Sequence, residues 1–421
     1  MASFVGAIHR IWLQAKPPVA TKQEDTLKIG ILGAAMIAPM AVIIPAISHP
    51  EVVIYAVAAR DHARATAFAK QHGIPVVKES YQAKRIFIAL LDDPVIDAVY
   101  NPLPNGLHLE WSLKALAKGK HVLLEKPSCS NAEEAEILFK SPLLKGPNAP
   151  VLMEAFHSRF TPAWRTFMEA IDQPNVAHVL AKAFFPSFFI SDGNIRFAYD
   201  LAGGATMDVG TYTMAALRSV FGTEPEECLE ANLERMAPPR EKTDGNFKAK
   251  LRFPGGGIGE IEGGLRGSNI PTSWDFSTAT VTHRPVVVTD QKVAEGEELK
   301  KTRTVTFVNF MISPLYHRID IVDEFVVTNK GSSEVVRKFT RKETKKAYSY
   351  KEMGIDQPGE IYWLTYRHML EQFVNRIRGR EGTGVFISHE DSIAQMKALD
   401  MVYEKSGLGL RPTSKYRLDA S

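Results

Sequence analysis

Short apolar runs rich in β-branched residues alternate with helical stretches between Leu27 and Glu154, and this alternation constrains the fold most. Strands of a parallel sheet joined by helices of this length are typical of βαβ units. The chain therefore begins with a predicted α/β, doubly wound parallel sheet. Its expected strands are 28–32, 52–57, 98–100, 121–124 and 151–154, and its expected helices are 38–47, 64–72, 83–91, 107–118 and 132–139.

After about Phe156 the pattern changes to alternating or β-branched runs with few helices between them, which predicts a large, mainly antiparallel open sheet. These runs are 177–185, 247–253, 258–264, 279–288, 303–310 and 318–327. The triplet Gly255-Gly256-Gly257 predicts a hairpin loop. Helical spacing returns over 360–376 and 390–403. Because 421 residues exceed one typical core, we expect an N-terminal extension (1–26), a first domain (27–155) and a second α/β domain (156–421).

The overall composition argues against several classes of partner. The 51 basic and 48 acidic residues are interspersed, so a nucleic-acid partner is not expected. No apolar run approaches the ~20 residues of a membrane helix. The 2 cysteines fit a reducing, cytoplasmic compartment, and no residue cluster has the spacing of metal ligands.

The segment 1–26 has an amphipathic start, with apolar residues from Phe4 to Trp12 at helical spacing. A short helix that packs on the body and ends at Lys16-Pro17-Pro18 is the favoured interpretation. A mitochondrial presequence is the alternative, although a single arginine and little serine speak against it.

A turn of small residues follows the first expected strand. Gly33, Ala35 and Ala38 occupy the small positions of a dinucleotide-binding fingerprint, and Met36 and Ile37 lie between them. Such a turn lets the pyrophosphate of a dinucleotide approach free N–H groups at a helix start. The middle glycine is absent, so a strand-to-helix turn with small packing residues is the alternative. Its place after the first strand of a βαβ series favours a nucleotide-binding Rossmann domain.

The end of the second expected strand indicates which dinucleotide binds. An NAD enzyme places an acidic residue here to accept from the ribose 2′-hydroxyl, whereas this chain reads Ala58-Ala59-Arg60-Asp61. Arg60, with Arg64 four residues later, predicts a 2′-phosphate and hence NADP. Two alternatives stay open: Asp61 is the ribose acceptor of NAD, or it caps the following helix.

A lysine stands at the carboxyl end of the strand 121–124, in Glu125-Lys126-Pro127, where open α/β sheets bind ligands. This stretch resembles the signature of the glucose–fructose oxidoreductase/inositol dehydrogenase (Gfo/Idh/MocA) family, and the resemblance runs from Leu27 to about Pro412. Leu103-Pro104-Asn105 with His108 resembles the nicotinamide-side loop of that family, and Glu125 and Lys126 join the expected cofactor contacts.

The segment 201–212 resembles the helix that carries the other catalytic groups of the family. The resemblance implies that Lys126 and Tyr212 are the catalytic pair, that Asp208 supports them and that the Lys126–Pro127 bond is cis. A tyrosine at position 212 resembles the branch of dimeric dihydrodiol dehydrogenases and fungal NADP-linked D-xylose dehydrogenases. It also implies pairing of subunits, since an open sheet normally covers its exposed face.

The chemistry of this pair is consistent with alcohol oxidation. Loss of hydride from carbon requires a base near the hydroxyl, and a free tyrosine, with a pKa of about 10, is a weak base at neutral pH. We expect the Lys126 ammonium to lower the pKa of Tyr212. Asp208 and Tyr212 are four apart and share a face if the segment is helical.

An aromatic run over 184–189 precedes several polar residues in the second half of the chain. Aromatic faces stack on sugar rings or arenes, although such a run is more often core. The expected substrate contacts are Arg159, Asp192, Asn194 and Arg196.

Together these patterns predict an NADP-dependent dehydrogenase acting on an aldose C1 hydroxyl or a trans-dihydrodiol. An oxidoreductase with the same site but a specialised metabolite as substrate is the first alternative. A non-enzymatic NADP-binding regulator is the second, because the resembled family includes a yeast galactose-pathway repressor. The presence of both Lys126 and Tyr212 argues against a regulator.

Overall fold

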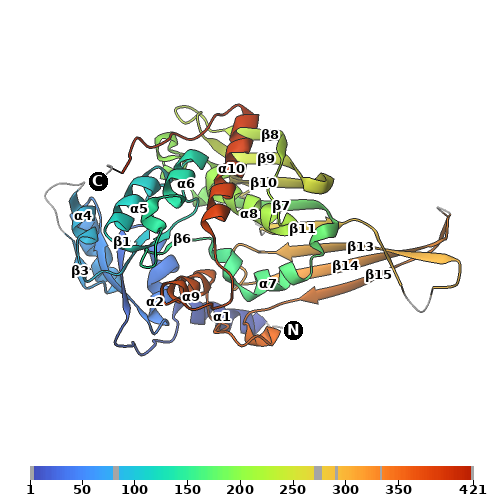
Figure 1. Ribbon diagram of the computed structural model, residues 1–421, viewed down its shortest axis with the longest axis horizontal. Coiled ribbons are helices and arrows are strands. Elements are labelled where there is room, and N and C mark those ends of the chain that lie inside the picture. Colours follow the sequence, from blue (N-terminus) through green and yellow to red (C-terminus); the bar gives the residue numbers. More distant parts are fainter. Residues whose placement is uncertain (1–3, 79–84, 270–276, 290–292, 332–333, 419–421) are drawn as a thin grey trace.

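The computed structural model describes residues 4–78, 85–269, 277–289, 293–331 and 334–418. Within them, two β-sheets are the frame of the molecule, and Figure 1 shows the first sheet with its helices at one end and the second sheet extending away at the other. We call them the first sheet and the second sheet. This is the expected fold class, a Rossmann sheet followed by a larger, mainly antiparallel sheet.

The first sheet has six parallel strands among the described residues, in the order β3-β2-β1-β4-β5-β6. Its strands are β1 (Leu27–Leu32), β2 (Val52–Ala58), β3 (Val76–Val77), β4 (Ala98–Asn101), β5 (His121–Leu124) and β6 (Leu152–Glu154). Its helices are α2 (Ile44–Ile47), which continues a π-helical turn (Pro39–Ile43), α3 (His62–His72), α4 (Arg85–Leu91), α5 (His108–Ala117) and α6 (Ala132–Phe139).

The central strands of this sheet are buried on both faces, as a parallel sheet covered by helices requires. Ile29, Ile31 and Leu32 of β1 are at most 1% exposed. Each expected strand of 27–155 is present, and β3 is an additional one. The first two residues of the expected helix 83–91 lie outside the described residues.

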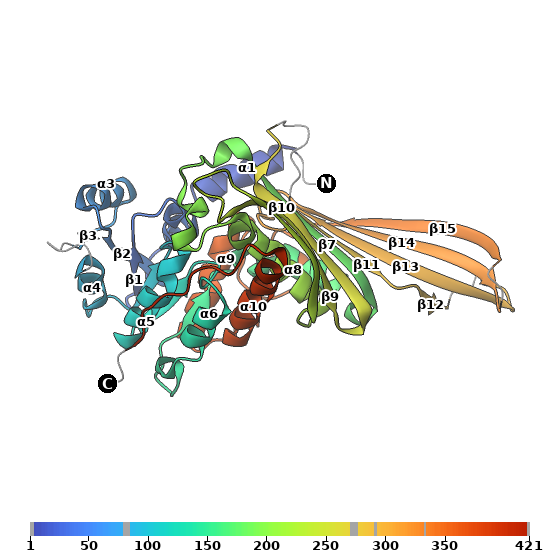
Figure 2. The same cartoon turned by 90° about the horizontal axis from the view of Figure 1, so that it is seen from above.

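The second sheet runs β15-β14-β13-β11-β7-β10-β9-β8, with β12 paired to β13. Neighbouring strands are antiparallel in the described part, except that β7 and β10 are parallel. The strands are β7 (Val176–Pro186), β8 (Glu227–Arg235), β9 (Asp244–Phe253), β10 (Gly257–Gly267), β11 (Thr278–His283), β12 (Val286–Val288), β13 (Glu297–Val308), β14 (Arg318–Asn329) and β15 (Val335–Lys345). In Figure 2 the strands β13 to β15 reach well beyond the helices.

Two strands of the second sheet were not expected from the sequence, and both are its edges. β8 and β15 carry many charged residues, and β15 is exposed along almost its whole length. Charges on an edge strand discourage pairing with other chains, but they remove the alternation that marks a half-buried strand.

The expected run 279–288 is interrupted, and forms β11 and β12. The expected hairpin loop joins β9 to β10 at Pro254–Gly256.

The helices of the second half connect the two sheets. They are α7 (Pro162–Glu169), α8 (Thr211–Phe221), which follows a π-helical segment (Thr206–Gly210), α9 (Thr365–Ile377) and α10 (His389–Ser406). Figure 1 shows α10 between α6 of the first sheet and β8 of the second, and it contacts both.

The N-terminal helix α1 (Phe4–Ala15) packs on the second half, which agrees with the favoured interpretation of that segment. Its Arg10 guanidinium lies 3.8 Å from the ring centroid of Tyr348, and Gln14 donates to the oxygen of Pro314 across 3.0 Å.

The segment after α10 crosses back to the first sheet (Figure 1). The Asn131 side chain, which caps α6, donates to the backbone oxygen of Arg411 across 2.9 Å. The backbone N–H of Ser414 donates to Glu134 across 2.6 Å. We call residues 409–414 the return segment.

Candidate active site

The turn after β1 has the backbone that the small residues predict. Gly33 has a φ of +93°, and its N–H donates to the oxygen of Ala58 on β2 across 2.6 Å. A Cβ at this position would lie 3.3 Å from the Leu103 side chain. The turn therefore favours glycine both by its conformation and by the close approach of the 103–108 loop.

The next residues leave donors open at the start of the helix. Among the described residues, the backbone N–H groups of Met36 and Ile37 donate no hydrogen bond. The Met36 side chain is 88% exposed, whereas Ala38 is fully buried beneath the helix. Free N–H groups at a helix start form a site for an anionic group such as a pyrophosphate.

Two arginines follow β2, Arg60 in the turn after it and Arg64 in α3. Arg64 donates to the backbone oxygen of Ala34 across 2.8 Å, so its guanidinium lies against the turn after β1. Arg60 is exposed, and no partner for it occurs within the described ranges. Asp61 caps α3 by accepting from the N–H of Arg64 across 3.0 Å, as one of the alternatives proposed.

The two halves of the chain meet at Lys126. The residue follows β5, its bond to Pro127 is cis as the resemblance implied, and its side chain is 11% exposed. Its Nζ donates to the Oδ1 of Asp208 across 2.7 Å and to the Asp208 backbone oxygen across 2.9 Å. The same Nζ lies 4.7 Å from the centroid of the Tyr212 ring. Lys126, Asp208 and Tyr212 thus form one cluster.

Asp208 holds two cations in this cluster. Its Oδ2 accepts from Arg196 Nε across 2.8 Å, so one carboxylate pairs with both Lys126 and Arg196. Burial works to raise the pKa of Asp208, but the charges and hydrogen bonds of Lys126 and Arg196 outweigh it, and the pKa is lowered. Asp208 is therefore a carboxylate that keeps the Lys126 ammonium in place.

The protonation of Tyr212 differs from the sequence-based expectation. Its phenol is 6% exposed, and its pKa is raised well above the usual value. Burial is the main cause, and the neighbouring Tyr366, Glu125 and Asp208 add to it. The expected lowering by Lys126 is wrong for this arrangement, because burial disfavours the phenolate and the Asp208 carboxylate, which is paired with the same ammonium, adds to that effect.

The sequence patterns did not predict several residues that surround Tyr212. His157 Nε2 lies 2.7 Å from the Tyr212 hydroxyl, and the ring of Tyr366 of α9 packs on the His157 ring, with 4.0 Å between centroids. Tyr100 of β4 donates to Glu125 across 2.6 Å, and burial raises the pKa of this carboxyl. His157 is a single histidine after β6, and one such residue forms no sequence motif.

The loop 103–108 joins both halves of the site. Asn105 donates to the backbone oxygen of Ala202 across 3.0 Å. His108 is fully buried, with Nε2 2.6 Å from the oxygen of Leu103 and Nδ1 3.0 Å from the oxygen of Pro127, and burial lowers its pKa to about 4. Because a neutral ring carries one N–H, it donates to one of these two oxygens and only contacts the other, and it lies between the loop and the residue after Lys126. A direct cofactor contact of His108 stays a prediction.

The four expected substrate residues have different surroundings. Arg196 reaches the cluster through Asp208, and Asn194 accepts from the backbone N–H of Arg196 across 3.0 Å. Arg159 instead pairs with Asp391 of α10, which also binds Arg218. The Arg159 guanidinium is thus neutralised within the protein, and its substrate contact gains no support from this geometry.

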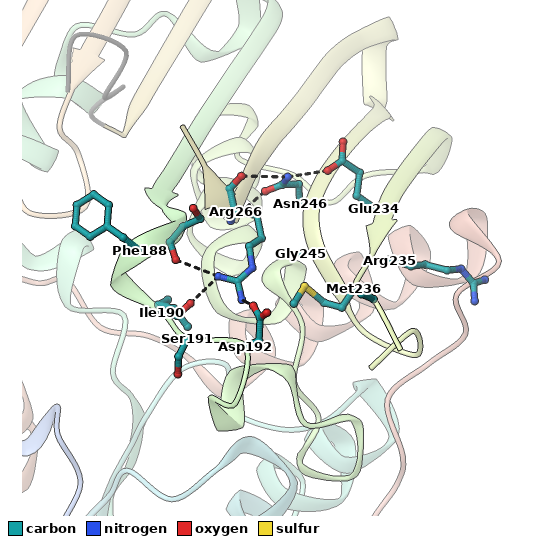
Figure 3. Close-up of a pocket in the computed structure, with 12 residues that line it drawn as sticks. Phe188, Ile190, Ser191, Asp192, Glu234, Arg235, Met236, Gly245, Asn246 and Arg266 are labelled. Atoms are coloured by element: carbon teal, nitrogen blue, oxygen red, sulfur yellow. Dashed lines mark hydrogen bonds and ion pairs between the residues drawn. The ribbon is translucent and has the colours of Figure 1, made fainter. Parts of the chain in front are cut away.

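Asp192 lies at a separate open pocket of about 630 Å³ (Figure 3). It pairs there with Arg266, whose guanidinium also donates to the oxygen of Ile190 across 2.6 Å and lies 4.5 Å from the Phe197 ring centroid. The pocket is lined by residues of 187–192, 234–237, 245–246 and Arg266. Its substrate role also stays a prediction.

The return segment supports the backbone before Asp208. Arg411 is 1% exposed and donates to the oxygen of Gly203 across 2.9 Å, between the rings of Tyr199 and Tyr403. Gly204 has a φ of +142°, and a Cβ there would lie 2.3 Å from Asp244 and 2.7 Å from the Tyr403 hydroxyl. The backbone leading to Asp208 is therefore tightly enclosed.

The described residues contain no group of three or more His, Cys, Asp and Glu side chains arranged to hold a metal ion. None of the described helices combines the length and the apolar character that a membrane crossing needs.

Comparison with known families gives two matches along the chain. The model of an oxidoreductase family with an NAD-binding Rossmann fold, Gfo/Idh/MocA, matches residues 27–142, and the model of the Gfo/Idh/MocA C-terminal domain matches residues 171–269.

Curated relatives agree with these matches. The chain is 43% identical over 199 residues to a D-xylose 1-dehydrogenase (NADP(+)) of Haloferax volcanii, covering 47% of this chain and 58% of that one. It is 31% identical over 249 residues to the mouse trans-1,2-dihydrobenzene-1,2-diol dehydrogenase, covering 59% of this chain and 71% of that one. The match thus spans little more than half the length of the archaeal relative.

Solved structures share the fold. A 3-ketoreductase from Actinomadura kijaniata, in complex with NADP and TDP-benzene, superimposes with a TM-score of 0.63 at 22% identity, over 90% of this chain and 98% of that one. An aldose-aldose oxidoreductase from Caulobacter crescentus superimposes with a TM-score of 0.65 at 19% identity, over 91% and 98%. The family matches, the mouse relative and the shared fold together show that this chain belongs to the Gfo/Idh/MocA oxidoreductase family.

Proposed function

We propose that the chain is an NADP-dependent oxidoreductase that transfers hydride between the cofactor and a hydroxyl-bearing carbon of a sugar or cyclic diol. The observation that carries the proposal is the meeting of Lys126 from the first sheet with Tyr212 from the second half, 4.7 Å from Nζ to ring centroid, beside Asp208. The names of the archaeal xylose dehydrogenase and the mouse dihydrodiol dehydrogenase support this substrate class.

The residues after β1 and β2 fit a dinucleotide. A side chain at position 33 would crowd the turn, because its Cβ would lie 3.3 Å from the Leu103 side chain. The free N–H groups of Met36 and Ile37 suit a pyrophosphate. Arg60 and Arg64 supply positive charge at the strand end where a 2′-phosphate would lie, while the Asp61 carboxylate is engaged in capping α3. These features favour NADP over NAD.

Bound NADP would supply the hydride acceptor or donor, and the residues of the cluster would manage the substrate oxygen. The Lys126 ammonium has three N–H groups, of which two donate to Asp208. The third is left to donate to a substrate oxygen and to stabilise negative charge that develops on it. Asp208 and Arg196 hold the ammonium in this position.

Tyr212 is the group that we assign to proton exchange. Its raised pKa keeps the phenol protonated in the resting protein, so it is ready to protonate the oxygen of a carbonyl substrate during reduction. Oxidation is the reverse transfer: the phenol first releases its proton to solvent, and the phenolate then accepts the proton of the alcohol. In the proposed reaction, the Lys126 ammonium and the Tyr212 phenol both act on the same substrate oxygen.

The test is turnover with a substrate panel. Purified protein is mixed with NADP and aldoses or cyclic diols, or with NADPH and the corresponding carbonyl compounds, and absorbance of the reduced nicotinamide is followed. Turnover that disappears in Lys126→Met supports the proposal. NADP binding without turnover on any compound would favour the non-enzymatic regulator instead.

The domain boundaries 27–155 and 156–421, a homo-oligomer and a cytoplasmic location are further parts of the proposal. β15 is exposed along almost its whole length and many residues of β13 and β14 are only partly buried, so this end of the second sheet offers a face that a second copy would cover. Sedimentation of the purified protein and fractionation of cells test the assembly and the location.

A further inference from the structure

His157 is buried directly behind the proposed proton-exchange group. The residue begins a short 3-10 turn (His157–Phe160) after β6 and is 2% exposed. Its Nε2 lies 2.7 Å from the Tyr212 hydroxyl oxygen. Its ring faces that of Tyr366, with 4.0 Å between centroids and 32° between planes. The imidazole is thus held between two phenols, one of which belongs to the site.

The other ring nitrogen of His157 indicates where its proton lies. Nδ1 is buried and has no hydrogen-bond partner in the described structure. Burial and the charge of Lys126 lower the pKa of His157 to about 3, so the ring is neutral and carries one proton. An unpaired buried N–H is rarer and more costly than an unpaired lone pair. The favoured tautomer therefore carries its hydrogen on Nε2.

This tautomer fixes the direction of the hydrogen bond to Tyr212. With the hydrogen on Nε2, the imidazole donates and the phenol oxygen accepts, so the single hydrogen of Tyr212 must point elsewhere. In the opposite tautomer the phenol would donate to His157, and its hydrogen would be held away from a substrate.

The other groups around the Tyr212 phenol do not replace this donor. The titratable or charged groups that face it are Lys126 and Glu125 after β5, Asp208 before α8, Tyr366 of α9, Tyr100 of β4 and His157 itself. Glu125 and Asp208 oppose a phenolate by their charge, and Lys126 lies over the ring. An N–H donated to the oxygen is the local contact that favours the phenolate.

We propose that His157 is a positioning residue that donates its Nε2–H to the Tyr212 oxygen, orients the phenol hydrogen toward the substrate and stabilises the phenolate formed in the reaction. The inference rests on the proposed function. In reduction, the O–H bond of Tyr212 breaks, the proton passes to the carbonyl oxygen and the electron pair stays on the phenol oxygen. The carbonyl carbon gains hydride from NADPH, and oxidation follows the reverse course.

The first experiment compares kcat and KM across pH for wild type, His157→Phe and His157→Gln. Phenylalanine keeps an aromatic ring against Tyr366 but has no donor, whereas the glutamine amide can place an N–H near the position of Nε2. We expect His157→Phe to raise the kinetic pKa assigned to Tyr212 by about one unit and to lower kcat about tenfold, with KM little changed. His157→Gln is expected to restore most of both.

Comparing the effect of His157→Phe in wild-type protein and in Tyr212→Phe protein separates this role from a purely structural one. In Tyr212→Phe protein the oxygen that His157 contacts is absent, so adding His157→Phe should lower kcat little further. A His157→Phe protein with the pH profile of wild type would overturn the proposal. An equal loss in both backgrounds would do so as well.

The second experiment reads the tautomer without turnover. Wild-type protein labelled with ¹⁵N-histidine is studied by NMR, and the His157 signals are assigned by their loss in His157→Gln. We expect the proton on Nε2 and none on Nδ1. A proton on Nδ1 would overturn the inference. If the substrate panel gives no turnover, the proposed function fails on that result, while the tautomer still decides the hydrogen bond of His157. The NMR result also holds if His157→Phe does not fold.

Discussion

Arg64 Nη2 donates to the backbone oxygen of Ala34 across 2.8 Å, and this contact joins the helix after β2 to the turn after β1. It brings a guanidinium to the place where the fingerprint predicts a pyrophosphate. Arg60, four residues earlier, has no protein partner in the described structure and remains available to a second phosphate. Because Asp61 is engaged as the cap of α3, cofactor preference should depend mainly on Arg60.

Arg60→Asp should therefore weaken NADP binding by roughly 10- to 100-fold, since a charge-assisted hydrogen bond contributes about 1.5–3 kcal/mol. NAD binding should change little, because NAD lacks the 2′-phosphate. Titration calorimetry with both cofactors measures the two affinities. Lys70→Asp, the same charge change at the far end of α3, is the control and should leave both nearly unchanged. Equal losses for NADP and NAD would remove the NADP assignment.

Lys126→Met and Tyr212→Phe should each lower kcat by on the order of 10²–10⁴-fold, the usual range for a group that takes part in proton transfer. The double variant should be little slower than the slower single one, because both residues act on one oxygen. Steady-state kinetics on the best substrate of the panel tests this. Lys118→Met, which breaks only an exposed pair with Asp92, is the control. Losses that multiply would mean that the two residues act independently.

Gly204→Ala should destabilise the protein by ~3 kcal/mol or more, because the added Cβ would overlap Asp244 and the Tyr403 hydroxyl in a backbone conformation that favours glycine. Gly255→Ala is the matched control: its φ is also positive, at +73°, but nothing lies within 4 Å of the added carbon. There we expect a loss of only about 1–2 kcal/mol from the backbone. Urea unfolding of both variants provides the comparison, and similar losses would contradict the assigned overlap.

Glu154→Gln should change how stability depends on pH. Burial, with the charge of Asp391 adding to it, raises the pKa of Glu154 to about 8. Between the unfolded value of about 4.3 and 8, the folded protein keeps a proton that the unfolded chain releases. The free energy of unfolding therefore falls as pH rises through this window, with a slope of up to ~1.4 kcal/mol per pH unit.

The variant lacks this titration, so its stability should gain on that of wild type as pH rises from 5 to 8. Chemical unfolding at several pH values measures the difference. Glu136→Gln, at an exposed carboxylate whose pKa is lowered by Lys397 and Lys140, should run parallel to wild type over the same range. A parallel curve for Glu154→Gln as well would contradict the raised pKa.

Much of the fold could be predicted from local patterns, and the exceptions have one physical cause. Strands buried on both faces, such as β1, carry mostly apolar residues, and α5, which covers the sheet, buries Leu109, Leu113 and Leu116 at helical spacing. β8 and β15 lie at the edges of the second sheet and are largely exposed, so selection for burial leaves no alternation in them. The periodicity of apolar residues reflects the burial of one face, so an exposed strand shows little periodicity.

The candidate site likewise contains residues that the sequence predicts and residues that it does not. Lys126, Asp208 and Tyr212 stand in recognisable stretches, and the structure brings them into contact. His157 and Tyr366 are single polar residues among apolar ones, and their relation to Tyr212 arises only from tertiary packing. The pKa of Tyr212 was mispredicted for the same reason, because its burial and the carboxylate on Lys126 are properties of the folded chain.

The return segment has a consequence for the order of assembly. Arg411 reaches Gly203 across 208 positions, and Ser414 reaches Glu134 across 280. Contacts so distant along the chain form late, because a long loop must close first. The residues of the nucleotide-binding half are continuous in sequence, yet α6 forms its last hydrogen bonds only when the return segment packs against it. An isolated 27–155 fragment would therefore expose polar groups at α6 that the whole protein keeps paired.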